Sequence, residues 1–146
     1  ILILNTLEEI SSEKKIDIIF PAHPRTKKII KNLKLKKINK IKIIQPCRYK
    51  NSLTFINNAK LVVTDSGGLQ EEACILKTPC VTIRKNTERP ETLRINSNFL
   101  TGYNKKKIRQ GIFKMISKIP SWKQPYGQNV SKKILNIILK NAKYKK

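Results

Sequence analysis

Short apolar runs alternate along this chain with segments in which apolar residues recur every three or four positions. The short runs predict strands, over residues 16–20, 41–44, 61–64 and 81–83, with a further short strand around Phe99. The other segments predict helices, over residues 4–14, 25–33, 49–58, 68–76, 105–119 and 130–142, and Pro90 suits the first position of another. Strands that alternate with helices form parallel βαβ units, so the pattern predicts an α/β fold with a Rossmann-like parallel sheet flanked by helices.

The length of the chain suits one ordinary domain. Its 146 residues leave little room for a second core. Residues 1–119 carry the alternating pattern, and residues 120–146 read as a linker followed by a final helix. The first residue is Ile1 and the single methionine is Met115, so we expect a fragment of a longer protein.

Polar or turn-forming segments follow four consecutive predicted strands at their carboxyl ends. They comprise residues 21–23, 46–47, 65–68 and 84–89. In an open doubly wound sheet, ligands bind outside the carboxyl ends of the strands. We therefore expect these loops to converge on one edge of the sheet and to form a binding site there.

The strongest candidate is the turn at residues 65–68, which lies between an apolar strand and a helix. Backbone N–H groups at a helix start have no intrahelical acceptor and attract anions. Gly67 and Gly68 let a ligand approach the backbone closely, Ser66 adds a hydroxyl, and Glu72 lies about one turn into the helix. A phosphorylated sugar or a nucleotide fits this mixture.

The formal net charge of +23, from 32 Lys and Arg against 9 Asp and Glu, raises the possibility of a nucleic-acid partner. The basic residues are spread over the whole length, and only 6% of residues are aromatic, so stacking platforms for bases are missing. We expect no specific nucleic-acid binding. The sequence contains neither an apolar stretch of about 18 residues nor a leader, which predicts no membrane span and a cytoplasmic location.

The cysteines give no sign of a metal site. Cys47, Cys74 and Cys80 are odd in number and lack a paired metal-ligand spacing, so we expect reduced thiols and no bound metal. Cys74 falls on an apolar helix face and Cys80 opens an apolar strand. Both are interpreted as small buried hydrophobic residues.

Five segments resemble the C-terminal domain of non-hydrolysing UDP-N-acetylglucosamine 2-epimerases. They are PAHPR at 21–25, TDSGGLQEEA at 64–73, PCVTIR at 79–84, TERPE at 87–91 and PYG at 125–127. The resemblance implies a two-domain fold of the glycosyltransferase-B type, of which this chain is the C-terminal half. It implies interconversion of UDP-N-acetylglucosamine and UDP-N-acetylmannosamine, by elimination and re-addition of UDP, with no redox cofactor and no metal.

Carried over residue by residue, the resemblance assigns roles around the glycine turn. Ser66, Gly67 and Gly68 would hold the diphosphate of a UDP-sugar, Glu72 the ribose hydroxyls, and Arg89 would contact the UDP part as a cation. These roles agree with the anion-binding chemistry of the turn.

The remaining positions are less sharply assigned. Cys47 falls where backbone groups of the family approach the uracil, and Ser52 where some members place an aromatic ring. His23 is either part of a second, regulatory UDP-sugar site or a strand-end histidine that is hydrogen-bonded to the backbone. Glu71 is interpreted as a solvated charge near the helix start, and Arg84 as the partner of a carboxylate.

The family's catalytic groups have no counterpart in this chain. Its His-Arg-x-Glu-Asn motif and the acidic groups that move the C2 proton lie ahead of the segment with which this chain begins. The resemblance therefore implies no catalytic residue here, an N-terminal domain supplied from elsewhere, and a homodimer for the full-length enzyme. Two alternatives stay open: an epimerase of a related UDP-2-acetamido sugar, although those relatives tend to have Trp where this chain has Arg89, and a nucleotide-sugar-binding module without catalysis.

Overall fold

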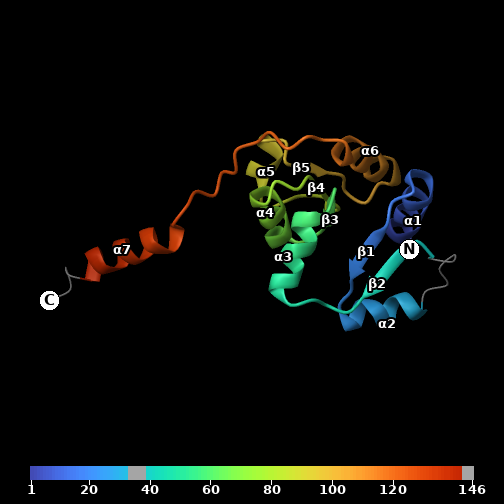
Figure 1. The fold of residues 1–146 in the computed structure, drawn as a ribbon, viewed down its shortest axis with the longest axis horizontal. Helices are drawn as coiled ribbons and strands as arrows, with labels where there is room; N and C mark the ends of the chain where they lie inside the picture. Colours follow the sequence, from blue (N-terminus) through green and yellow to red (C-terminus); the bar gives the residue numbers. More distant parts are fainter. Residues whose placement is uncertain (33–38, 143–146) are drawn as a thin grey trace.

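The computed structural model describes residues 1–32 and 39–142, in which helices and short strands alternate (Figure 1). The helices are α1 (Leu2–Lys14), α2 (Pro24–Asn32), α3 (Tyr49–Asn58), α4 (Gly67–Ile75), α5 (Pro90–Arg94), α6 (Lys105–Ile116) and α7 (Val130–Ala142). The strands are β1 (Ile18–Pro21), β2 (Ile41–Ile44), β3 (Val62–Thr64), β4 (Cys80–Thr82) and β5 (Asn98–Leu100). Every element expected from the sequence pattern is present.

Element boundaries differ from the predicted ones by a few residues. Helix α6 ends at Ile116 instead of residue 119, and Ile119 is 84% exposed, so its side chain gains nothing from a longer helix. Strand β4 begins one residue earlier than predicted, at Cys80, because its N–H donates to Ser97 O of the neighbouring chain segment. The predicted C-terminal residue of the second helix, Leu33, lies outside the described residues.

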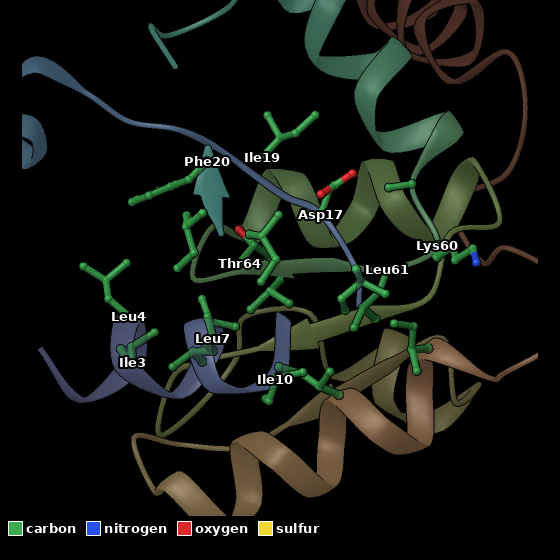
Figure 2. Close-up of a pocket in the computed structure, with 18 of the residues that line it drawn as sticks. Ile3, Leu4, Leu7, Ile10, Asp17, Ile19, Phe20, Lys60, Leu61 and Thr64 are labelled. Carbon is green, nitrogen blue, oxygen red and sulfur yellow. The ribbon is translucent and has the colours of Figure 1, made fainter. Parts of the chain in front are cut away.

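The strands are parallel, as predicted, but they form two sheets. Strand β1 pairs with β2, with Ile18 opposite Ile41, and β3, β4 and β5 form a second sheet in that order. The expectation that four strand ends converge on one edge of a single sheet is therefore wrong. Strands β1 and β3 both line a cavity of about 760 Å³, and no ladder of hydrogen bonds joins them within the described chain (Figure 2).

This cavity is apolar. Residues of α1, β1 and β3 turn Ile, Leu, Val and Phe side chains into it, and Figure 2 shows Leu4, Leu7 and Ile10 of α1 on the side opposite Phe20 of β1. Residues of both β1 and β3 line this cavity, whereas strands that pair lie roughly 4.8 Å apart. The arrangement separates the β1–β2 pair from the three-stranded sheet.

Helices cover both faces of the three-stranded sheet. On one face, α1 and α6 pack over β4 in a cluster of buried apolar side chains: Ile10, Val81, Ile83, Ile108, Ile112 and Met115. On the other face, Ile56 of α3 and Ala73 of α4 pack with Cys80. Successive residues Cys80 and Val81 face opposite sides, as the alternation of a strand buried on both faces requires.

Helix α6 lies unusually close to β5 at Gly111. A Cβ at this position would lie 2.8 Å from Cδ1 of Phe99 and 2.9 Å from Cγ2 of Thr101. Glycine is therefore the residue that permits this packing distance.

Helix α7 stands apart from the other elements at the end of an extended segment (Figure 1). Its described residues are all exposed, including Ile137 at 60% and Leu139 at 53%. None of the helices within residues 1–32 and 39–142 is long and apolar enough to span a membrane.

Candidate functional site

The glycine turn is shaped by the end of β3. Thr64, the last residue of the strand, accepts a hydrogen bond through Oγ1 from the Ser66 N–H at 3.0 Å. Ser66 is the N-cap of α4, and its Oγ accepts from the Leu69 N–H at 3.5 Å. The first N–H groups of the helix, from Gly67 and Gly68, have no carbonyl ahead of them in the helix and are available to a ligand.

The two glycines have different surroundings. A Cβ on Gly67 would lie 3.3 Å from Glu88 Oε2 and 3.8 Å from Arg89 Cζ, so the 87–89 loop rests against the turn at this residue. A Cβ on Gly68 would meet only Ser66 Oγ, at 3.9 Å. The turn is thus covered by a charged loop on one side and open on the other.

Arg89 is held beside the turn. Its half-buried guanidinium forms an ion pair through Nε with Glu71 of α4, and its Nη1 donates to Glu88 O at 3.0 Å. The buried Nε contacts the Glu71 carboxylate as a charge pair rather than through a directional hydrogen bond. The structure therefore brings Arg89 to the turn, as expected from the resemblance.

Glu71 was interpreted as a solvated charge, and that interpretation is wrong. Residues four apart share a helix face, so Glu71 lies below Gly67 and faces the loop that covers it, whereas Glu72 lies below Gly68 on the open side. The helix spacing gives the face of Glu71, but its pairing with Arg89 appears only in the structure, because Arg89 comes from another segment. Arg84 does pair with a carboxylate: its Nη2 lies 3.0 Å from Glu88 Oε1.

The surroundings of Glu72 disfavour the charged form of its carboxyl group. Burial, and secondarily the neighbouring Glu71 charge, raise the pKa of its carboxyl above the ordinary value of 4.5. A raised carboxyl pKa means that protonation stabilises the folded state: the stabilisation is full below about pH 4.5 and is lost as the pH rises through the folded-state pKa.

We expect Glu72→Gln to raise the free energy of unfolding at pH 7 relative to the wild type, with the difference shrinking as the pH falls through the raised folded-state pKa toward 4.5. The reason is that glutamine cannot carry the disfavoured charge. Urea unfolding at several pH values measures the effect, and Asp17→Asn, which changes an exposed carboxylate in the same way, provides the control. A lower stability of Glu72→Gln at pH 7 would show that its charge is compensated in the fold.

His23, Cys47 and Ser52 belong to other segments than the glycine turn: His23 follows β1, Cys47 follows β2, and Ser52 is in α3. His23 is exposed, and its Nδ1 accepts from the Arg25 N–H at 3.3 Å, which is the backbone-bonded strand-end role. Cys47 is half-buried in the loop after β2, and Ser52 donates its backbone N–H to Arg48 O in the first turn of α3. Over the ranges 1–32 and 39–142, no hydrogen bond or ion pair joins these three residues to the turn.

The two cysteines near the site are inert. Burial raises the pKa of the Cys74 thiol, and it raises that of Cys80 to about 12. Both are protonated at neutral pH and pack as small apolar groups, which confirms their interpretation. In the described part of the chain, no group of three His, Cys, Asp or Glu side chains is arranged to hold a metal ion.

Two aromatic residues of the segment after α6 are hydrogen-bonded to α4 and α5. Trp122 is buried, and its Nε1 donates to Cys74 O at 3.0 Å. Tyr126 Oη donates to Glu91 Oε1 at 2.9 Å, and burial followed by this contact raises the pKa of the phenol. Both rings therefore brace α4 and α5, and neither faces the turn as a stacking platform.

Known proteins resemble this chain in sequence and in fold. A sequence profile described as UDP-N-acetylglucosamine 2-epimerase matches residues 2–139. The UDP-N-acetylglucosamine 2-epimerase of Methanocaldococcus jannaschii is 50% identical over 131 residues, which make up 87% of this chain and 36% of that protein. Its counterpart from Methanococcus maripaludis is 45% identical over 146 residues, 97% of this chain and 40% of that protein. The chain thus spans between 36% and 40% of the length of these relatives.

Solved structures agree with the sequence matches. The crystal structure of the M. jannaschii enzyme in complex with UDP-GlcNAc and UDP matches 96% of this chain and 40% of its own, with a TM-score of 0.87 and 46% identity. That of the Neisseria meningitidis enzyme bound to UDP-GlcNAc matches 95% of this chain and 40% of its own, with a TM-score of 0.77 and 28% identity. These matches confirm the predicted Rossmann-like α/β fold of the glycosyltransferase-B type. The chain belongs to the UDP-N-acetylglucosamine 2-epimerase family.

Proposed function

We propose that the chain is the UDP-binding half of an isomerase that interconverts UDP-N-acetylglucosamine and UDP-N-acetylmannosamine. The reaction eliminates UDP and adds it back with the configuration at C2 inverted. The observation that carries the proposal is the contact of Arg89 with the Gly67 turn, because it sets a cation beside a bare helix start. The diphosphate is the part of a UDP-sugar whose charge is stabilised both by a cation and by the N–H groups of a helix start.

Each group near the turn has a place in this scheme. The Ser66 hydroxyl and the N–H groups of Gly67 and Gly68 donate to the diphosphate, and the guanidinium of Arg89 balances its charge. In the free chain Glu71 neutralises Arg89, so the diphosphate takes over part of that contact when it binds. Glu72, on the Gly68 side, accepts from the ribose hydroxyls, which explains why a carboxylate that weakens the fold is kept there.

The remaining assignments rest on family membership. Backbone groups at Cys47 approach the uracil, with Ser52 beside it, and the loop at His23 borders a second UDP-sugar site. His23 follows β1, Cys47 lies in the loop after β2, and Ser52 is in α3, which packs against α4. No metal and no redox cofactor take part.

Residues 1–119 form the UDP-binding domain, and residues 120–146 return toward an N-terminal domain that supplies the catalytic groups. The exposure of Ile137 and Leu139 on α7 supports this, since apolar side chains gain stability when another surface covers them. The complete enzyme is a homodimer in the cytoplasm, and the free state of all three cysteines suits that reducing compartment.

UDP binding to the 146-residue chain tests the proposal by titration calorimetry. We expect UDP to bind more tightly than UMP and uridine, and Arg89→Ala to weaken UDP binding by about ten- to a hundredfold, because a charge-assisted contact is lost. Arg94→Ala is the control: Arg94 is exposed at the end of α5, the short helix that begins just after Arg89, and its substitution should leave the affinity unchanged.

Two results would contradict the proposal. One is a folded chain that does not bind UDP, and the other is an Arg89→Ala variant that binds UDP as tightly as the wild type. The reaction itself is followed as formation of UDP-N-acetylmannosamine when the N-terminal portion of the M. jannaschii relative is fused ahead of Ile1.

A further inference from the structure

Gln70 is a polar side chain in the core of the site. It is 0% exposed and lies one turn after Ser66 on α4. Burial of an amide without hydrogen-bond partners is strongly unfavourable. The hydrogen bonds of Gln70 therefore indicate which segments this side chain connects.

The two ends of the Gln70 amide bind different segments. Its Nε2 donates to Ser66 O, at 3.3 Å, in the glycine turn. Its Oε1 accepts from Thr87 Oγ1 at 2.5 Å and from Asn98 Nδ2 at 3.1 Å. One side chain therefore joins the helix start to the loop that carries Arg89.

The Arg89 backbone is held from both sides by this network. Its N–H donates to Thr87 Oγ1 at 3.0 Å, and its carbonyl oxygen accepts from Thr92 Oγ1 at 2.7 Å. Thr92 Oγ1 in turn accepts from Asn98 Nδ2 at 3.1 Å. The hydroxyl of Thr87 and the amide of Asn98 both donate to Gln70 Oε1. The hydrogen bonds at the Arg89 N–H and at the Arg89 carbonyl oxygen are therefore both connected to this one atom.

The proton positions are mutually determined. Asn98 Oδ1 accepts from Thr82 Oγ1 at 2.9 Å, which directs the Asn98 amide NH₂ toward Gln70 and Thr92. Gln70 must then present its oxygen to the loop and its NH₂ to Ser66. A flipped amide would set donors against donors, so one arrangement of turn and loop satisfies every group.

We infer that Gln70 is a positioning residue that couples the Ser66 turn to the Arg89 loop, so that both diphosphate contacts are already aligned before the ligand arrives. The inference rests on the proposed UDP binding. Gln70 does not touch the ligand; it acts through Ser66 and Thr87. Alignment in the free state lowers the ordering entropy that binding must otherwise overcome.

UDP titration of Gln70→Leu and Thr87→Val tests the coupling. Leucine keeps the volume of Gln70 and removes both polar ends, and we expect each variant to bind UDP about tenfold more weakly. Thr78→Val is the control, because Thr78 is buried and its Oγ1 donates to Ile56 O at 2.8 Å, outside the network. It should lose stability and keep the wild-type affinity.

A double variant separates positioning from general destabilisation. If Gln70 acts through the Arg89 loop, the double variant Gln70→Leu/Arg89→Ala should lose less UDP affinity than expected from independent effects. Its total loss should be much smaller than the product of the losses in the two single variants. Two results would overturn the inference. One is a double variant whose loss of UDP affinity equals the product of the two single losses, and the other is wild-type affinity in both Gln70→Leu and Thr87→Val.

Amide hydrogen exchange provides a readout that needs no ligand. In the free chain, the Arg89 N–H should exchange about tenfold faster in Thr87→Val and in Gln70→Leu than in the wild type, and no faster in Thr78→Val. Unchanged Arg89 exchange in Thr87→Val would reject the coupling even if Gln70→Leu does not fold. The variants could show this exchange pattern while the wild-type chain does not bind UDP. That result would reject the proposed function and leave the coupling as a purely structural one.

Discussion

Replacement of Gly68 with alanine is expected to weaken UDP binding by about ten- to a hundredfold without lowering the free energy of unfolding. A Cβ at this position would meet only Ser66 Oγ, at 3.9 Å, so the chain has room for it. Alanine is also favoured over glycine inside helices, by up to about 1 kcal/mol. The added methyl group would stand beside the N–H groups that we assign to the diphosphate and would hold the phosphate oxygens out of hydrogen-bond range. Calorimetry gives the affinity, and urea unfolding gives the stability.

Gly67→Ala is the contrasting variant. Its Cβ would lie 3.3 Å from Glu88 Oε2, so the end of the Glu88 side chain, which pairs with Arg84, has to shift by a few tenths of an ångström. We expect this variant to lose affinity together with some stability, whereas Gly68→Ala loses affinity alone. Wild-type UDP affinity in Gly68→Ala would show that the diphosphate does not lie on the open side of the turn.

Gly111→Ala is expected to lower the free energy of unfolding by about 1–3 kcal/mol, although alanine is the better helix former. The new Cβ would lie 2.8 Å from Phe99 Cδ1 and 2.9 Å from Thr101 Cγ2, distances at which α6 must move away from β5. Because α6 also contributes Ile108, Ile112 and Met115 to the core, any displacement disturbs that packing. Urea unfolding measures the loss.

Gln110→Ala serves as the control for this variant, because Gln110 is the exposed neighbour on the same helix. It should keep or slightly raise the stability. If Gly111→Ala were as stable as the wild type, the helix would have to sit farther from the sheet than the structure places it.

The order of elements was predictable from the sequence because it depends on local properties. Apolar runs such as residues 41–44 and 62–64 are strands in the structure, and the period of α6 places Ile108, Ile112 and Met115 on the buried face. The glycine turn was predictable for the same reason: Ser66 and the two glycines form a helix start whatever surrounds them.

The grouping of strands into two sheets was not predictable, since it depends on which elements line the space between β1 and β3. Their side chains face a cavity shared with α1, and nothing in the pattern of either strand specifies its neighbour. The Glu71–Arg89 pair and the Gln70 network join residues from different segments, so they appear only once the 87–92 loop is folded over α4. The sequence motif predicts a ligand at the glycine turn, and the tertiary contacts show what holds the turn and the 87–92 loop together.

The contact between Trp122 and α4 also makes the site observable by fluorescence. Trp122 is the one tryptophan of the chain, and its indole is 6% exposed beneath the Lys77 ammonium group, 5.7 Å from the ring. Its Nε1 is bound to Cys74 O near the end of the helix whose other end carries the glycine turn. All tryptophan emission therefore comes from one known position, and a change in its wavelength or intensity reports directly on the C-terminal end of α4 without any added dye.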